Sequence, residues 1–302
     1  MVGGDEYKEY TGKDGSTYSF PDLGGQPVQD MNDVANALEK HGYDVIRCKN
    51  PTRDQFKAAL TDFESKIEEL KLSGDDSLVA FFYYAGHGVQ VPSPDDDTGE
   101  PNNFLICHDT TWLTQEEVDE ADTIHLKIAR KNRHFSKSAI NLREKVVDMI
   151  RRASRCAGIE KVFSVIVLDC CRENPNLGSI IGRNVQGRGG NAGVEPTNVG
   201  VGKAAGSASL IAFSCSAGQY ANNSEEGKQN GLYTGAVLES LVDPNCKVST
   251  TFSKATSIVR RTIAEGRSTG RANYKDQEPL VVGDMPYEWE DLVWQLLKPK
   301  AI

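Results

Sequence analysis

The chain has 302 residues, of which 38% are hydrophobic and 25% are charged, so it can bury a sizeable core and its composition excludes a disordered protein. Its net charge of −9 excludes the basic surface that general nucleic-acid binding requires and favours basic partners instead. No apolar run approaches the roughly 18 residues of a membrane-spanning helix, and the N-terminus shows no signal-peptide core, so no membrane partner is expected. Seven cysteines, an odd number, then indicate reduced thiols in a cytoplasmic protein.

The first half of the chain predicts alternating helices and strands. The apolar side chains of residues 30–41 have helical spacing, and Gly42 ends this helix. A second helix opens at Thr52, where Gln55 stands in the capping-box position. Three strands are expected, at residues 43–47, 77–84 and 104–107. The apolar run SLVAFFYY at residues 77–84 favours a buried strand.

The second half continues this pattern around a glycine-rich interruption. Residues 178–206 hold nine glycines and almost no bulky apolar side chains, so we expect a long, mobile linker inside the domain. Residues 108–137 are charged and give no clear assignment. Strands that alternate with helices predict an α/β fold, in which a mainly parallel sheet is flanked by helices on both faces. The remaining elements are helices at residues 138–152, 232–241 and 251–264 and strands at residues 162–168, 209–213 and 279–282.

Two reactive side chains follow two buried strands of this predicted sheet. His87 comes just after residues 77–84, and Cys171 comes just after residues 162–168. Because open sheets bind ligands at the carboxyl ends of their strands, we expect His87 and Cys171 to lie close together. A histidine can take the proton of a cysteine, whose thiolate is the nucleophile, and the Gly88 N–H could stabilise an oxyanion. The alternative is a turn histidine and a cysteine that only packs, but their joint placement favours catalysis.

Four motifs carry a resemblance to a known family: FYYAGHGVQ, VIVLDCCRENP, SLIAFSCSAGQYA and GLYTGAVLESL. They resemble the paracaspases and, more broadly, the caspase-like cysteine peptidases that include the metacaspases. The resemblance runs from about residue 2 to about residue 282. It implies a caspase-like fold, with His87 as the catalytic histidine and Cys171, not Cys170, as the nucleophile. It also implies that the amides of Gly88 and Cys171 form the oxyanion hole.

Three departures from the family pattern refine this resemblance. Animal caspases carry Q-A-C-R-G around the nucleophile, whereas this chain carries DCCRE, so cleavage after aspartate is not implied. Metacaspases typically have His-Ser after the nucleophile, and Arg172 and Glu173 in that place favour the paracaspase side. The family also begins with a full buried strand. Only Met1 and Val2 precede Gly3 here, so we expect the chain to start inside that strand.

Three positions bear on the residue before the cut: Asp30, Asp169 and Gln219, all expected at the carboxyl edge of the sheet. In paracaspases and metacaspases the residues that match Asp30 and Asp169 are acidic and line the pocket, so the resemblance implies an Arg or Lys side chain there. Two carboxylates also suit the hydrogen bonds of a guanidinium. Some paracaspases have a third acid at the position of Gln219. Because this chain has no acid there, the preference between Arg and Lys stays undecided. The alternatives are a helix N-cap for Asp30 and a hydrogen-bonded strand end for Asp169.

Other features carry further expectations. Asp95, Asp96 and Asp97 offer oxygen ligands for calcium, which activates many metacaspases, although such a run is more often a solvated loop. His108, His125 and His134 have no Cys or His partner at a zinc spacing, so no zinc site is expected. No organic cofactor is implied either. Trp289 and Trp294 suggest a C-terminal amphipathic helix. Five further cysteines are expected to be buried packing thiols: Cys48, Cys107, Cys156, Cys215 and Cys246.

The sequence as a whole predicts one caspase-like peptidase domain, with a large-subunit-like part (residues 1–177), the linker and a small-subunit-like part (residues 207–302). Its expected function is a cysteine endopeptidase that cuts proteins or peptides after Arg or Lys. The alternatives are a signalling scaffold that does not cut and a related cysteine transpeptidase or ligase. Monomer and homodimer are both compatible with the sequence. The linker either stays intact or is cut by the protein itself at one of three basic residues, of which Arg188 is the first candidate: Arg183, Arg188 and Lys203.

Overall fold

The computed structural model describes residues 1–11, 15–70, 77–93, 101–111, 113, 117, 120–171, 207–216, 219, 221–222, 229–242, 246–269, 274 and 276–284. Several predictions fall outside these residues. They concern the linker at residues 178–206, the acidic run from Asp95 to Asp97, and the C-terminal helix with Trp289 and Trp294.

A six-stranded sheet forms the centre of the fold, in the strand order β11-β10-β9-β5-β1-β4. Its neighbouring strands run parallel, except that β11 runs antiparallel to β10. This topology confirms the predicted mainly parallel sheet and places β5, which precedes His87, directly beside β9, which precedes Cys171. The strands are β1 (Val2–Gly3), β4 (Cys48–Lys49), β5 (Ser77–Gly86), β9 (Lys161–Cys170), β10 (Ser207–Phe213) and β11 (Leu280–Asp284).

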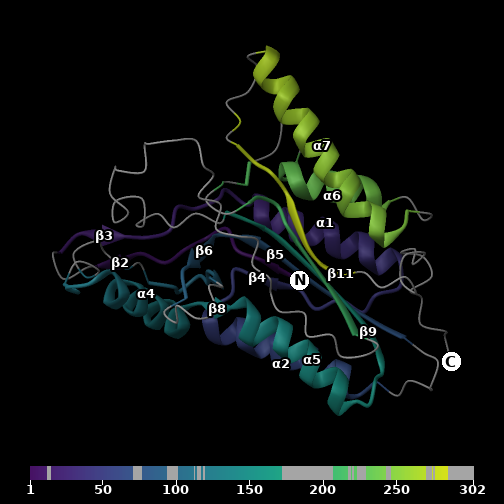
Figure 1. Ribbon diagram of the computed structural model, residues 1–302, viewed down its shortest axis with the longest axis horizontal. Helices are drawn as coiled ribbons and strands as arrows, with labels where there is room; N and C mark the ends of the chain where they lie inside the picture. The colour runs from purple at the N-terminus through teal and green to yellow at the C-terminus, as the bar shows by residue number, and fades with distance from the viewer. Residues whose placement is uncertain are drawn as a thin grey trace.

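Helices cover both faces of this sheet, as the alternation of strands and helices predicts (Figure 1). Side chains of β5 alternate between two buried cores, with Phe81 and Tyr83 in one and Phe82 and Tyr84 in the other. Burial on both faces explains why β5 and β9 are continuous apolar runs. One face carries α1 (Gln26–Lys40), α6 (Leu232–Leu241) and α7 (Val248–Thr269), and the other carries α2 (Arg53–Glu68) and α5 (Asp148–Cys156).

A small antiparallel sheet begins directly after His87. It consists of β6 (Gly88–Val91), β7 (Asn102–Leu105) and β8 (Ile140–Asn141), and α4 (Ile124–Ser138) packs beside it (Figure 1). Tyr7 and Phe20 belong to the small core of this region. They flank the hairpin of β2 (Tyr10–Thr11) and β3 (Thr17–Tyr18), so the segment after β1 folds over the neighbourhood of His87.

Three predicted elements are wrong in type or position. Residues 43–47 form no strand; the pairing partner of β1 is β4, which begins at Cys48, because β1 is only two residues long. Residues 138–152 are not one helix, because β8 pairs with β7 there and a π-helical turn (Arg143–Val147) leads into α5. The first helix begins earlier than predicted, with Gly25 as its N-cap and Pro27 in its first turn. Asp30 is therefore inside α1 and is not its N-cap.

The remaining elements agree with their predictions more closely. The capping box of α2 is confirmed, because the Gln55 N–H donates to Thr52 Oγ1 at 3.3 Å and the Thr52 N–H donates to Gln55 Oε1 at 2.9 Å. α7 is longer at both ends than residues 251–264. The prediction of buried packing thiols is wrong for Cys156, which is exposed in the last turn of α5, and Cys48 is only half-buried. Of the helices that the structure describes, none combines the length and the apolar character needed to cross a membrane.

Candidate active site

The two reactive segments leave the sheet side by side. In the register of β5 and β9, Ala85 lies opposite Asp169 and Gly86 opposite Cys170. His87 follows Gly86 on one segment, and Cys171 follows Cys170 on the other. A Cβ atom on Gly88 would lie 2.7 Å from Cys170 Sγ and 2.8 Å from the Cys171 carbonyl oxygen, which is too close for any side chain. The absence of a side chain at Gly88 thus lets the histidine segment pack directly on the cysteine segment.

The Gly88 N–H is turned away from its neighbouring strand. Gly88 lies opposite Leu105 in the antiparallel pair of β6 and β7, and the Ile106 N–H donates to the His87 carbonyl at 3.1 Å. This bond makes Gly88 and Leu105 a non-hydrogen-bonded pair, whose own N–H groups point outward. The ladder of β6 and β7 therefore does not use the Gly88 N–H, which is the property that an oxyanion donor needs.

His87 is held by the segment that follows β1. Its ring packs against the rings of Tyr7 and Phe20, with centroid distances of 4.9 Å and 5.6 Å, and these two rings also contact each other at 6.0 Å. His87 Nε2 lies 2.8 Å from the carbonyl oxygen of Pro21. A carbonyl can only accept, so Nε2 carries the proton of the neutral ring and Nδ1 keeps its lone pair. Nδ1 is then the nitrogen that can act as a base.

Burial lowers the pKa of His87, although the Pro21 carbonyl and the charge of Asp22 oppose this effect. The imidazole is therefore neutral near pH 7 and able to accept a proton. The two adjacent cysteines differ in access, because Cys170 is buried whereas Cys171 is half-buried. Cys171 is thus the thiol of the pair that a substrate can reach.

Asp30 and Asp169 come together from different elements, α1 and the end of β9. A Cβ atom on Gly231 would lie 3.0 Å from Asp30 Oδ2 and 3.3 Å from Asp169 Oδ2, so the two carboxylates flank the same glycine. Both side chains are buried. Asp30 accepts from the Gly231 N–H at 3.1 Å and from the Asn230 amide at 3.0 Å. The structure thus unites the two acidic positions that the sequence singles out.

The proximity of these carboxylates changes their protonation. Burial, followed by the charge of Asp169, raises the pKa of Asp30 to about 7. Burial also raises the pKa of Asp169, although Thr234 opposes this effect by donating its hydroxyl to Asp169 Oδ2 at 2.6 Å and its N–H at 3.2 Å. No cation of the described residues is among the causes of either shift, and a cation placed between the carboxylates would favour the ionised form of both.

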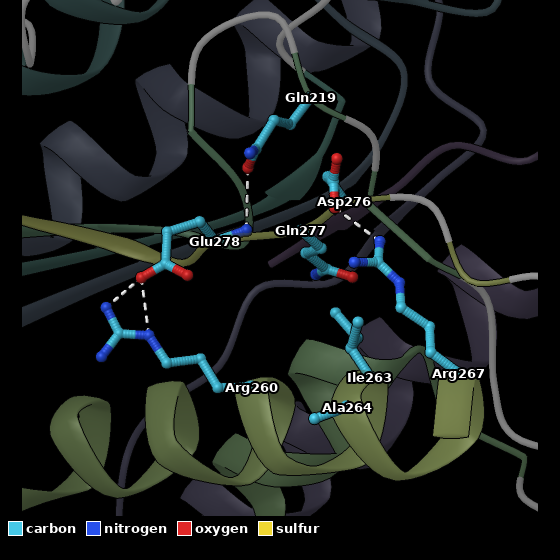
Figure 2. A pocket seen from close by; sticks show the side chains of 8 residues that line it. All are labelled: Gln219, Arg260, Ile263, Ala264, Arg267, Asp276, Gln277 and Glu278. Carbon is cyan, nitrogen blue, oxygen red and sulfur yellow. Dashed lines mark hydrogen bonds and ion pairs between the residues drawn. The ribbon is translucent and has the colours of Figure 1, made fainter. Parts of the chain in front are cut away.

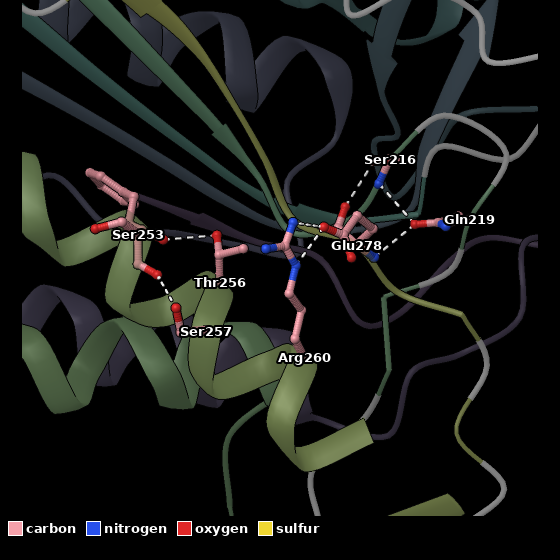
Figure 3. A network of polar contacts seen from close by, with 8 residues as sticks. Ser216, Gln219, Ser253, Thr256, Ser257, Arg260 and Glu278 are labelled. Carbon is pink, nitrogen blue, oxygen red and sulfur yellow. Dashed lines mark hydrogen bonds and ion pairs between the residues drawn. The ribbon is translucent and has the colours of Figure 1, made fainter. Parts of the chain in front are cut away.

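The hydrogen bonds of the Gln219 side chain involve backbone groups and neither carboxylate of the pair. Its side-chain oxygen accepts from the N–H groups of Ser216 at 3.2 Å and Glu278 at 2.8 Å, so it ties the loop after β10 to the segment before β11. It lines a cavity of about 230 Å³ above α7, together with Arg260 and Arg267 (Figure 2). In the same region Arg260 pairs with Glu278 (Figure 3). Through these contacts Gln219 stabilises the loop after β10.

Sequence reasoning missed several residues of the site. Pro21 contributes a backbone carbonyl, which leaves no signal in the residue type. Thr234 and Gly231 lie in the GLYTGAVLESL motif and could have been found there, since a glycine and a hydroxyl residue open α6. Within the described residues, no three His, Cys, Asp or Glu side chains gather in a way that would hold a metal ion.

A family model for the caspase domain matches residues 18–285. The chain belongs to the caspase-domain family. The model covers most of the chain, and the family implies cysteine peptidase activity in general. Among solved structures, this caspase-domain protein is similar to protein GSU0716 from Geobacter sulfurreducens, with 13% sequence identity and a TM-score of 0.46. The similarity covers 87% of this chain and 86% of that one. No curated protein matches the chain.

Proposed function

We propose that this caspase-domain protein is a cysteine endopeptidase that cleaves after Arg or Lys, with Cys171 as nucleophile and His87 as acid and base. The observation that carries the proposal is the packing of Gly88 against the Cys170–Cys171 segment, because it brings the two reactive positions to one edge of the sheet. The neutral, Nε2-protonated imidazole and the reachable thiol of Cys171 support the same assignment.

In the proposed reaction, His87 Nδ1 takes the proton of the Cys171 thiol, and the thiolate attacks the scissile carbonyl. The N–H groups of Gly88 and Cys171 stabilise the oxyanion that forms. The imidazolium then gives its proton to the departing amine, which leaves an acyl-enzyme. Water, activated by His87, attacks this thioester, releases the new carboxyl terminus and regenerates the thiol. Protons balance over the cycle, and no cofactor is required.

The residue before the cut is proposed to be basic because of Asp30 and Asp169. A guanidinium offers several N–H donors to a pair of carboxylates, and its positive charge would stabilise their ionised form. The sequence predicts Gln219 in the same pocket. Its side-chain oxygen is already bonded to two backbone N–H groups, so we assign the basic preference to the two acids.

A matched set of fluorogenic peptides tests this proposal. The peptides differ only in the residue before the cut, which is Arg, Lys, Gln or Asp. The purified protein should cleave the Arg and Lys peptides with a kcat/KM at least about a hundredfold above that of the Gln peptide, because leaving buried carboxylates without a cationic partner costs several kcal/mol. Equal cleavage of the four peptides would remove the proposed specificity, and no cleavage at all would favour a non-cutting scaffold.

Self-cleavage is a further expected activity of an Arg-specific peptidase with basic residues in a glycine-rich segment. Wild type should yield fragments that end at Arg183, Arg188 or Lys203, whereas Cys171→Ala should stay intact. Intact-mass analysis after incubation with and without calcium measures both the cut and its dependence on the ion. An uncut wild-type chain with full peptidase activity would contradict both the cleavage and an activating role for it.

A further inference from the structure

His87 lies between two strands, since β5 ends at Gly86 and β6 begins at Gly88. Two tyrosine hydroxyls hold its main chain there. The His87 N–H donates to the hydroxyl of Tyr7 at 3.1 Å, and the Tyr84 hydroxyl donates to the His87 carbonyl at 2.7 Å. We propose that Tyr7 and Tyr84 are positioning residues of the reaction, which fix the peptide groups on both sides of His87. This inference rests on the proposed role of His87.

The hydrogen atoms of this arrangement are assigned by its chemistry. The Tyr7 hydroxyl donates its proton to the Gly4 carbonyl at 2.7 Å, so its oxygen is free to accept from the His87 N–H. The Tyr84 hydroxyl has one proton, which it shares between the carbonyls of His87 at 2.7 Å and Ile106 at 2.9 Å, and it also lies within hydrogen-bonding reach of the Tyr7 hydroxyl. Burial raises the pKa of both tyrosines, so both hydroxyls stay protonated. Each therefore acts as a fixed hydrogen-bonding group over the working pH range.

Gly86 makes room for both hydroxyls. Its φ of 148° lies in the region that favours glycine, and a Cβ atom there would lie 2.8 Å from the Tyr84 hydroxyl and 3.0 Å from the Tyr7 hydroxyl. The missing side chain at Gly86 thus lets two tyrosines from different segments reach the main chain of the next residue.

The hydrogen bond from the Tyr84 hydroxyl to the His87 carbonyl also affects the N–H of Gly88. The carbonyl of His87 and the N–H of Gly88 belong to one rigid peptide plane and point in opposite directions. Donors from Tyr84 and Ile106 therefore fix the direction of the Gly88 N–H, which is the proposed oxyanion donor. Loss of the Tyr84 hydroxyl should loosen this plane and weaken stabilisation of the transition state.

Tyr7 acts on the imidazole in two ways. Its ring packs against the ring of His87, and its own N–H donates to Asp22 Oδ1 at 3.1 Å, beside the Pro21 carbonyl that accepts from His87 Nε2. Tyr7 thus joins the main chain of His87 to the segment that sets its tautomer. Loss of its hydroxyl should leave the ring contact in place but free the His87 N–H.

The test compares Tyr7→Phe and Tyr84→Phe with Tyr43→Phe. Tyr43 is the matched control, because its buried hydroxyl has no hydrogen-bond partner among the described residues. For each protein we would measure kcat and KM on the Arg peptide, the melting temperature, and the pH dependence of Cys171 alkylation by iodoacetamide.

Both test variants should lose about three- to tenfold in kcat with little change in KM, the usual effect of losing one hydrogen bond. In Tyr7→Phe the alkylation midpoint should also move to higher pH, because a misaligned His87 assists Cys171 less.

Several outcomes separate this inference from the proposed function. If both variants match Tyr43→Phe in kcat and in alkylation, the two tyrosines have no positioning role and the inference is wrong. If they only lower the melting temperature, their role is structural and the inference is again wrong. If wild type cleaves no peptide but its alkylation depends on His87, the peptidase proposal fails, and the alkylation profiles still decide the inference. If Tyr84→Phe does not fold, Tyr7→Phe decides it.

Discussion

Cys171→Ala should reduce cleavage of the Arg peptide to background, a loss on the order of 10⁴-fold or more in kcat, because alanine offers no nucleophile and removing one member of a catalytic dyad stops the covalent route. Peptide hydrolysis under saturating substrate measures this directly. The melting temperature of the variant should stay close to that of wild type, since Cys171 is half-buried and its side chain is small.

Cys170→Ala is the matched control, because it removes the same thiol one residue earlier. Cys170 is the last residue of β9 and is buried, whereas Cys171 follows the strand and is half-buried, so the two thiols differ in their access to substrate. Cys170 is buried against Gly88, and its loss should lower stability by about 1 kcal/mol while most of the activity remains. A dead Cys170→Ala together with an active Cys171→Ala would reverse the assignment of the nucleophile.

Burial on both faces is what made the central strands predictable from the sequence. β5 and β9 read as continuous apolar runs, and the parallel arrangement then sets the edge at which His87 and Cys171 emerge. Strand pairing could not be predicted in the same way. Residues 43–47 have the composition of a strand, but the short β1 pairs with Cys48 and Lys49 instead. Residues 138–152 have helical spacing, yet Ile140 and Asn141 form a strand that pairs with β7.

The same reasoning explains why the site was predicted only in part. A position just after a parallel strand fixes the edge of the sheet, which sufficed for Asp169 and Cys171. It does not fix the direction of a side chain, and Gln219 turns toward the backbone of Glu278 instead of toward the acids. Contacts that depend on the path of the N-terminal segment, such as the Pro21 carbonyl on His87, leave no pattern in the sequence.

Asp169→Asn should weaken Arg and Lys substrates by roughly a hundredfold or more in kcat/KM, because removing one charge from a desolvated ion pair typically costs about 3–5 kcal/mol. The amide can still accept from Thr234, so the local fold is retained and the effect reports on charge. The rate of Cys171 alkylation by iodoacetamide is the control for the dyad and should change little. An unchanged kcat/KM on basic peptides would remove Asp169 from the proposed pocket.

The pH dependence of binding provides an independent view of the same pair. The pKa of Asp30 is raised to about 7, so its carboxyl is increasingly neutral below that pH and ionised above it. A guanidinium binds the ionised form more tightly, and kcat/KM for the Arg peptide should therefore rise as the pH increases through about 7 and then level off.

The charge of Asp169 is one cause of the raised pKa, so in Asp169→Asn the pKa of Asp30 should fall and the midpoint should move to lower pH. In Asp30→Asn this limb should vanish, which leaves the titration of His87 below the ordinary histidine range. A profile that is flat around pH 7 in wild type would show that Asp30 does not bind the basic side chain. A midpoint that stays in place in Asp169→Asn would show that the charge of Asp169 does not raise the pKa of Asp30.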